Sequence, residues 1–397
     1  MKKNLFSLFV GALAVCALTL TSCNDNNDGN PSTPDSEQNL AGGITGTRTL
    51  DADTAYTLTG PVIVEDGGVL NIPAGTTIKA QPSFNSYILV LVGGVINIRG
   101  TAEAPVRITS AAASPKAGDW GGLIINGCAP LVGGTRGETE ISKQFLYGPI
   151  DGHPVNAADN SGTIEYLILE YTGNRSTADV EHNGLTLNGV GNGTTIRNIF
   201  IVDGSDDGIE FFGGSVNVEN LLVVNPDDDM FDFTQGYSGE LKNAYGIWEA
   251  SHTSIEADPR GVEADGNLDG LNPEYAGQSN FKLTNVTFDL RVAYLSGTLT
   301  FAAGTVTSAM QDVLKIRRSA QATITNALVK GTGRVQDMID ISDGSQEAPY
   351  ATTISITNGL TTAPDRPLNP AAYSGVTLAT GNTGCPTDIF AWTGYQF

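Results

Sequence analysis

Residues 196–220 read Ile-Arg-Asn-Ile-Phe-Ile-Val-Asp-Gly-Ser-Asp-Asp-Gly-Ile-Glu-Phe-Phe-Gly-Gly-Ser-Val-Asn-Val-Glu-Asn. The stretch begins and ends on one motif, an apolar residue, any residue and Asn. The motif returns along the chain with its Asn at Asn198, Asn220, Asn243, Asn285, Asn326 and Asn358. The first intervals are 22 and 23 residues, and insertions would explain the longer ones. A repeat of this length is typical of a solenoid in which each unit forms one coil.

A second motif alternates with the first and consists of Asp or Asn followed by two apolar residues in alternation. It occupies residues 183–187, 207–211, 229–233, 312–316 and 337–341, with a weaker copy at 269–272. The stretches with period-2 alternation are short and are separated by Gly, Asn and Asp, and no segment has a helical period. The sequence therefore predicts stacked parallel strands without crossover helices.

This pattern resembles the pectate-lyase-like class of right-handed parallel β-helices, in which stacked Asn side chains form a ladder at the turns. Residues 117–127, Ala-Gly-Asp-Trp-Gly-Gly-Leu-Ile-Ile-Asn-Gly, also resemble a motif of secreted β-helix proteins. The resemblance implies an all-β fold, a single-stranded right-handed parallel β-helix over residues 45–397 with an Asn ladder and inserted loops. We expect the aromatic C-terminal stretch, residues 388–397, to cap the last coil, because open strand edges invite association.

The N-terminus reads as a secretory signal peptide over residues 1–22, with a short basic head, an apolar run and a small-residue site. Its end, Leu20-Thr21-Ser22-Cys23, resembles a bacterial lipobox, which implies lipidation of Cys23. Residues 23–44 read as the lipidated Cys and a polar tether. The acidic, Asn-rich stretch after Cys23 resembles surface lipoproteins of the Bacteroides group. We therefore expect an outer-membrane, cell-surface location through a lipid anchor.

Composition narrows the range of partners. The net charge of −22 argues against nucleic acid and anionic membrane surfaces as partners and suits cations, neutral ligands or cationic ligands. The three His are scattered, and no His and Cys residues stand at zinc-site spacing. Cys128 and Cys385 could pair in an oxidising compartment or remain separate buried thiols, and the sequence leaves both alternatives open.

The second motif places acidic residues on one face of the predicted solenoid. Side chains alternate along a strand, so Glu210 should point outward and lie over Asp232 one coil later. Like charges that face each other in a sheet are unfavourable unless a cation bridges them, a carboxyl is protonated or the groups splay into water. We predict a Ca²⁺ site whose metal ligands are Asp206, Asp207, Asp228 and Asp229. The alternative is that these Asp residues only form turns and that Glu210 and Asp232 form a solvated face.

Two predicted insertions, roughly residues 244–268 and 286–311, should form loops on the same edge of this face. Such loops make a cleft wall. The first carries Trp248 and His252, which we expect to bind ligand together with the outward-facing Asp340. The alternative is that Trp248 packs the loop onto its coil.

Three functions remain open. The first is a binding protein that holds carbohydrate or another extracellular ligand on the acidic face. The second is an enzyme: the resemblance implies a lyase with carboxylate-bound Ca²⁺ and Lys315 or Arg317 as base, while Glu210 and Asp232 could form the carboxylate pair of a glycoside hydrolase. The polygalacturonase motifs Asn-Thr-Asp, Gly-His-Gly and Arg-Ile-Lys are absent from the sequence. The third is a structural or adhesive surface protein without a small ligand.

Overall fold

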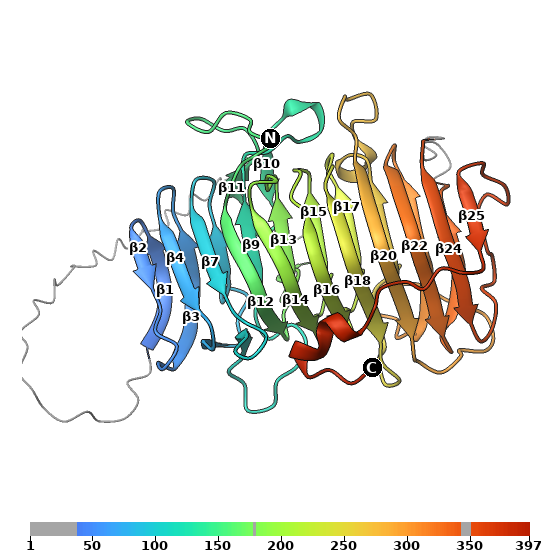
Figure 1. Cartoon of the computed structure of the whole chain (residues 1–397), viewed down its shortest axis with the longest axis horizontal. Helices are drawn as coiled ribbons and strands as arrows, with labels where there is room; N and C mark the ends of the chain where they lie inside the picture. The colour runs from blue at the N-terminus through green and yellow to red at the C-terminus, as the bar shows by residue number, and fades with distance from the viewer. Residues whose placement is uncertain (1–37, 178–179, 343–350) are drawn as a thin grey trace, which may run out of the picture. The chain divides into compact units, whose positions relative to one another are not determined.

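The computed structural model describes residues 38–177, 180–342 and 351–397, so the predicted signal peptide and Cys23 lie outside the described residues. The regular secondary structure of the described chain is almost entirely β-strand, and the strands stack along one axis (Figure 1). The first strands are β1 (Gln38–Ile44), β2 (Thr47–Thr49), β3 (Tyr56–Val64), β4 (Val69–Pro73), β5 (Thr77–Ala80), β6 (Ile88–Val90), β7 (Val95–Arg99), β8 (Val106–Ser110) and β9 (Leu123–Asn126). No helix in the described part of the chain is long and apolar enough to cross a membrane.

From residue 162 onward, each coil supplies one strand to each of two stacks. Column A contains β12 (Gly162–Glu170), β14 (Thr195–Val202), β16 (Val218–Val224), β18 (Glu240–Trp248), β20 (Asn280–Leu290), β22 (Gln321–Gly331) and β24 (Thr353–Leu360). Column B continues from β9 through β13 (Leu185–Asn188), β15 (Ile209–Phe212), β17 (Phe231–Thr234), β19 (Arg260–Asp265), β21 (Ala309–Arg317) and β23 (Arg334–Asp340). All neighbours within each column pair in parallel. The predicted right-handed parallel β-helix is confirmed.

The remaining elements lie outside these columns. The antiparallel hairpin of β10 (Gly137–Thr139) and β11 (Ser142–Tyr147) interrupts the chain between β9 and β12, together with the 3₁₀ helix η1 (Val132–Gly134). The 3₁₀ helix η2 (Leu268–Gly270) follows β19, β25 (Val376–Ala379) pairs with β24, and the 3₁₀ helix η3 (Asp388–Thr393) precedes the C-terminus.

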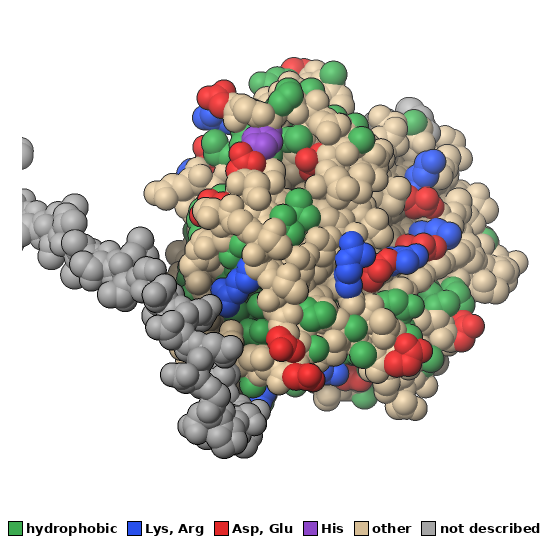
Figure 2. Space-filling model, turned by 60° about the vertical axis from the view of Figure 1, so that its left-hand side comes forward, with side chains coloured by type: hydrophobic (Ala, Val, Ile, Leu, Met, Phe, Trp, Pro, Cys, Tyr) green, Lys and Arg blue, Asp and Glu red, His purple; other side chains and the backbone are tan. Residues whose placement is uncertain are grey.

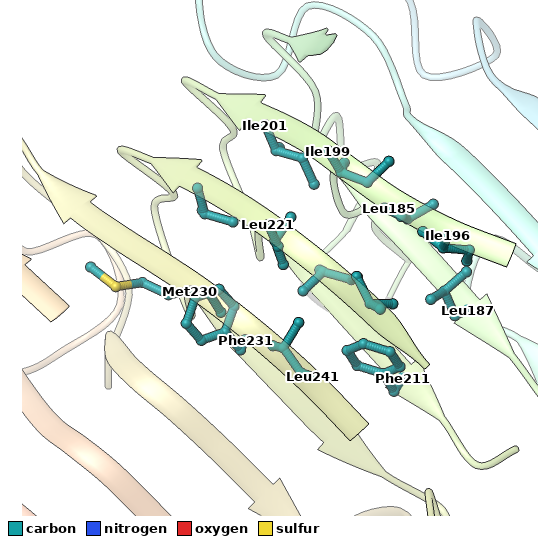
Figure 3. Packing of buried hydrophobic residues seen from close by; sticks show 14 of the residues in the cluster. Leu185, Leu187, Ile196, Ile199, Ile201, Phe211, Leu221, Met230, Phe231 and Leu241 are labelled. Atoms are coloured by element: carbon teal, nitrogen blue, oxygen red, sulfur yellow. The ribbon is translucent and has the colours of Figure 1, made fainter. Parts of the chain in front are cut away.

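The apolar residues of both motifs fill the interior between the columns. Figure 3 shows these side chains pointing inward from successive coils. Phe211, Phe231 and Phe233 have no exposed surface, and the rings of Phe211 and Phe233 stack one coil apart with 5.0 Å between their centroids. Each fully buried Phe contributes roughly 1.5–3 kcal/mol relative to an exposed one. The core therefore holds the coils in the register that positions column B.

The Asn ladder is present at the bends of the column A strands. From Asn198 to Asn326, the side-chain Nδ2 of each Asn donates to the side-chain Oδ1 of the Asn one coil earlier, at 2.8 to 2.9 Å. Each lies at positive φ, a conformation that Asn tolerates better than most residues. Asn358 is not part of the ladder, because the register shifts after Ile324 and Asn358 pairs with Val329.

Several predicted boundaries are wrong. The β-helix begins at Gln38 rather than at residue 45, because β1 already pairs with β3 and buries Leu40 and Ile44. Residues 269–272 form no strand. The column B strand of that coil is β19, which carries Arg260 at the motif's Asp position, and η2 lies in the loop that follows it.

The predicted insertions are shorter than expected, because β18, β19, β20 and β21 occupy parts of them. The loops themselves span residues 249–259 and 291–308. They lie on the same edge, as predicted, since Ser254 and Thr307 exchange backbone hydrogen bonds of 2.9 and 2.8 Å. A further loop, residues 266–279, approaches η1: the amide of Gly133 donates to the carbonyl oxygen of Ala276 at 2.8 Å.

The C-terminal segment does not cap the last coil. Figure 1 shows η3 in front of β14, β16 and β18, away from β25. The aromatic rings of this segment pack on outward-facing rings of column A, with Trp392 on Tyr166, Tyr395 on Phe200 and Phe397 on Tyr245. Those strands present an apolar outer side, which would otherwise contact water, and the C-terminal segment buries it.

Candidate functional site

Two polar positions repeat along column B. One lies between the two inward apolar residues of each strand, where successive coils place Thr186, Glu210, Asp232, Glu263, Lys315 and Asp340. The other is the position that precedes these apolar residues, where successive coils place Asn183, Asp207, Asp229, Arg260, Asp312 and Asp337. The predicted stacking of Glu210 on Asp232 is confirmed, and Asp207 is likewise next to Asp229 one coil later, so the 22-residue spacing is one coil.

Six of these side chains open into one cavity of about 160 Å³, which we call the acidic cavity: Asn183, Asp207, Glu210, Asp229, Asp232 and Glu263. Nine carboxyl groups and one amide line it: Glu140, Glu181, Asn183, Asp206, Asp207, Glu210, Asp228, Asp229, Asp232 and Glu263. Among the described residues, no basic side chain lines it. The structure thus brings together six of the predicted site residues around a single space.

Four carboxylate oxygens of the acidic cavity are buried and have no hydrogen-bond partner among the described residues. They are Asp206 Oδ2, Asp228 Oδ1, Asp229 Oδ1 and Asp232 Oδ1. Asp206 is 5% exposed and Asp229 is 2% exposed. A buried polar group without a partner costs about 1–3 kcal/mol, and more when it is charged. Several such groups buried in one place indicate a site that binds a cation, because a cation would satisfy their unpaired oxygens.

The carboxylates also meet the distance requirements of cation binding. One ligand oxygen from each of Asp206, Asp207 and Asp228 lies within 4.8 Å of the others, and the same holds for Asp207, Glu210 and Asp232. Ca²⁺ binds oxygen ligands at 2.3–2.6 Å, so two ligands on one ion are separated by at most about 5 Å. Both sets fit a hard cation.

The nearest guanidinium groups lie at the rim and are already engaged. Arg175 contacts Glu256 and Glu181 and donates to the carbonyl oxygen of Ser205 at 3.1 Å. Arg260 contacts Glu263, Asp258 and Asp312, and its Nη1 lies 3.8 Å from Asp229 Oδ2. These two guanidinium groups offset only part of the negative charge of the acidic cavity, because each is shared among several carboxylates.

Burial raises the pKa of the cavity's carboxyl groups, and their neighbours of like charge raise it further. The pKa of Asp228 and of Asp232 rises to about 7, and that of Glu140 to about 8. The pKa values of Asp206, Asp207, Glu210 and Asp229 rise well above their usual range for the same reasons. Without a cation, the folded protein therefore holds protons in this cavity at neutral pH.

Farther along column B, the chain balances its own charges. The Lys315 ammonium lies 2.9 Å from Asp340 Oδ2 and donates to the carbonyl oxygen of Ser342 at 2.7 Å. Burial would raise the pKa of Asp340, but hydrogen bonds from Lys315 and Ser342 outweigh it and lower the pKa. Lys315 and Asp340 are thus paired with each other rather than directed at the acidic cavity.

Column A shows the same balance on its outer side. In successive coils it carries Arg99, Glu165, Arg197, Glu219 and Lys242 at one position. A row of alternating basic and acidic side chains is visible on the face shown in Figure 2. Alternation is favourable between stacked strands. The acidic cavity departs from this balance, as do Asp312 and Asp337 farther along column B, each of which keeps one buried oxygen without a hydrogen-bond partner among the described residues.

Arg317 lies one coil beyond the cavity. Its guanidinium contacts Glu263 and donates to Asp265 Oδ1 at 2.9 Å. Burial, together with the positive charges of Arg260 and Arg318, lowers the pKa of Arg317 to about 10. Trp248, His252 and Asp340, which we predicted to bind ligand, do not line the acidic cavity.

Trp248 is fully buried in the core at the end of β18 and presents no surface to a ligand. Its ring packs 4.8 Å from that of His252, which is half-buried in the following loop and does not line the acidic cavity. The alternative interpretation, in which Trp248 packs the loop onto its coil, is the one that the structure supports.

Cys128 and Cys385 are separate buried free thiols.

Sequence reasoning missed three carboxylates of the cavity. Glu263 could have been found, because Val262-Glu263-Ala264 has the same apolar-acidic-apolar order as Ile209-Glu210-Phe211. Glu181 lies in the loop before β13, and Glu140 lies in the turn of the β10–β11 hairpin. No repeat carries these two positions, so only the tertiary structure brings them to the cavity.

A larger groove of about 860 Å³ adjoins the acidic cavity and shares Glu140 and Glu181 with it. The hairpin and residues 268–269 form its walls, and Arg136 and Lys143 lie among its lining residues. This volume is within the range of small-molecule sites, roughly 300–1,000 Å³. A ligand in the groove would reach the acidic cavity past Glu140 and Glu181.

Comparison with known proteins gives one match. A family model described as a pectate-lyase like beta helix domain matches residues 42–365, which covers most of the chain. No curated protein and no solved structure matches the chain.

Proposed function

The chain belongs to the family of pectate-lyase-like β-helix domains, and from this premise we propose that it binds acidic carbohydrate in a Ca²⁺-dependent manner. The acidic cavity would hold the cation, and the adjoining groove would hold the saccharide. The proposal is carried by the buried carboxylate oxygens without hydrogen-bond partners that face the acidic cavity. A cation would satisfy them and cancel the repulsion that raises their pKa values.

Calcium is the ion that suits these ligands best. The lining offers carboxylate and amide oxygens and neither His nor Cys, a set that favours hard cations over zinc or copper. Mg²⁺ demands octahedral geometry and keeps several waters, whereas Ca²⁺ accepts six to eight oxygens in irregular arrangements. Clustered carboxylates from three successive coils and two loops fit the second description.

Four carboxylates, Glu138, Glu140, Glu181 and Asp269, line the groove beside Arg136 and Lys143, so an acidic saccharide would depend on the bound cation as well as on these two basic residues. A bound cation would leave the cavity ready to coordinate a ligand carboxylate. Arg136 and Lys143 line the groove, and no described residue forms an ion pair with either of them. Both cations are therefore available to an anionic sugar, and Arg matches a carboxylate with two parallel hydrogen bonds.

Calorimetric titration of the purified mature domain with CaCl₂ tests the proposal. We expect saturable binding by the wild-type protein and a loss of at least a hundredfold in affinity in the Asp207→Asn/Asp229→Asn variant, because two charged ligands become neutral. Asp53→Asn removes one exposed carboxylate outside the cavity and should bind like the wild type. Equal affinities in all three proteins, or no binding in any, would exclude the acidic cavity as a calcium site.

Arg317 favours a second candidate, a polysaccharide lyase. Arg317 lies one coil from the cavity, and its guanidinium contacts Glu263, which lines the cavity. In this reading Arg317 removes a proton beside the carboxylate of a calcium-bound uronate. By contrast, one carboxylate oxygen of Asp232 lies within 4.8 Å of one of Glu210, a separation shorter than the roughly 5–9.5 Å of hydrolase pairs. A hydrolase that uses these two residues is therefore disfavoured.

Absorbance of unsaturated products near 235 nm distinguishes a lyase from a binding protein. With acidic polysaccharides and CaCl₂, the lyase reading expects product from the wild type and a loss of at least a hundredfold in rate in Arg317→Lys, since Lys cannot keep both carboxylate contacts. Binding without any product would leave the chain a calcium-dependent binding protein.

We also propose that Cys23 is lipidated and anchors the protein to the outer membrane at the cell surface. The signal sequence and the lipobox-like Leu20-Thr21-Ser22-Cys23 support this. Mass spectrometry of the mature N-terminus is the test, and an unmodified Cys23 would contradict it.

A further inference from the structure

A second pocket, of about 500 Å³, lies on the edge of the solenoid formed by the loops that follow β8, β12, β14, β16 and β18. We call it the lateral pocket. It shares no lining residue with the acidic cavity. Arg175 stands between the two, because its guanidinium contacts Glu181 of the acidic cavity and the carbonyl oxygen of Ser205 in the lateral pocket. The lateral pocket therefore needs its own explanation.

Its lining combines both charges with hydroxyl groups and two aromatic rings, those of Tyr171 and His252. The side chains that matter are Lys116, Tyr171, Asp203, Asn225, Asp227 and Thr253. A cationic ligand would meet Lys116, and an anionic one would meet Asp203 and Asp227. A neutral ligand rich in hydroxyl groups can use all of them, because hydroxyls both donate to carboxylates and accept from an ammonium.

The polar groups are held in place before any ligand arrives. The Asn225 amide donates to Asp203 Oδ1 at 3.0 Å and to Glu249 Oε2 at 3.1 Å. The backbone amide of Ile255 donates to Asp227 Oδ1 at 3.1 Å and so ties the 249–259 loop to the pocket. Fixed acceptors lower the cost of binding, since fewer side chains must be ordered.

The carboxylates are also partly removed from water. Asp203 and Asp227 are both half-buried, and burial raises the pKa of Asp203 above its usual value. A hydrogen bond to such a group is stronger than one at an open surface. Tyr171 adds a half-buried ring, whose apolar face suits the C–H side of a pyranose.

We propose that the lateral pocket binds a neutral sugar residue, with Asp203, Asp227 and Lys116 bonding its hydroxyls and Tyr171 contacting its ring. This goes beyond the proposed function, because it needs no cation and involves none of the residues of the acidic cavity. The two sites would let the protein hold an uncharged and an acidic part of extracellular carbohydrate independently.

Calorimetry with glucose, galactose, mannose, xylose and their β-linked disaccharides, in buffer that contains EDTA, tests this. We expect saturable binding of at least one sugar by the wild type. Tyr171→Asn and Asp203→Asn should each lower the affinity at least tenfold. Both positions have positive φ, which Asn tolerates, so the variants should fold. Tyr294→Asn, at an exposed tyrosine outside the pocket, is the matched control and should bind like the wild type.

Two results would overturn the proposal. The first is that none of the sugars binds saturably at concentrations up to about 10 mM, which is ten times the millimolar dissociation constant of a weak complex. The other is binding that both pocket variants leave unchanged. Binding that is seen only when CaCl₂ replaces EDTA, and that Asp207→Asn/Asp229→Asn abolishes, would overturn the proposal in the same way, since the sugar would then occupy the acidic cavity. Loss of calcium binding with intact sugar binding would instead contradict the proposed function alone.

Discussion

Replacing Asp232 by Asn should raise the melting temperature of the cation-free protein at pH 8, whereas replacing Asp340 by Asn should lower it. The two Asp residues occupy the same position of column B and undergo the same chemical change. Asp232 faces other carboxylates, and its pKa is raised to about 7. Asp340 is paired with Lys315 at 2.9 Å, and its pKa is lowered. The opposite shifts predict opposite effects on the free energy of unfolding.

The expected sizes follow from the same contacts. A tenfold change in proton affinity is about 1.4 kcal/mol, so Asp232 destabilises the folded state at pH 8 by about 4 kcal/mol at most, and Asn removes this penalty. Asp340→Asn leaves the buried Lys315 ammonium without a counter-charge, which costs about 3–5 kcal/mol when a buried pair is broken. Thermal denaturation in EDTA measures both. A lower melting temperature for Asp232→Asn would mean that the acidic cavity is not under electrostatic strain.

The second large effect is the pH dependence of stability. In EDTA, we expect the melting temperature to fall as the pH rises from about 4 to about 8. The sign follows from linkage: groups whose pKa is raised on folding stabilise the folded state fully only below their unfolded pKa, near 4, and lose that contribution as the pH passes their folded pKa. Those folded values are about 7 for Asp228 and Asp232 and about 8 for Glu140.

Calcium should remove most of this fall. A cation replaces the protons of the acidic cavity and binds more tightly as the carboxyl groups ionise, so its stabilising effect should grow with pH. At a calcium concentration one hundred times the dissociation constant, binding to the folded state adds about 2.7 kcal/mol. Melting curves from pH 4 to pH 9, with and without CaCl₂, measure the effect. A fall of equal size in both series would contradict a cation site among these carboxylates.

Much of the fold follows from the repeat itself. The 22-residue interval sets the length of one coil, and the alternation of apolar residues sets which side chains enter the core. These rules correctly place Glu210 over Asp232 and Asn198 under Asn220. They fail where an insertion or a substitution hides the motif, as in β19, whose turn position carries Arg260 rather than Asp.

The site depends more on tertiary structure than the fold does. The sequence by itself determined that carboxylates from neighbouring coils would stack, because stacking depends only on residues one repeat apart. It did not determine that Glu140 and Glu181 close the cavity, that Trp248 enters the core or that the C-terminal aromatics cover column A. Those outcomes depend on loops and tails that carry no repeat. Their positions are decided by burial of apolar surface and by charges far apart in the chain, and only the assembled solenoid provides both.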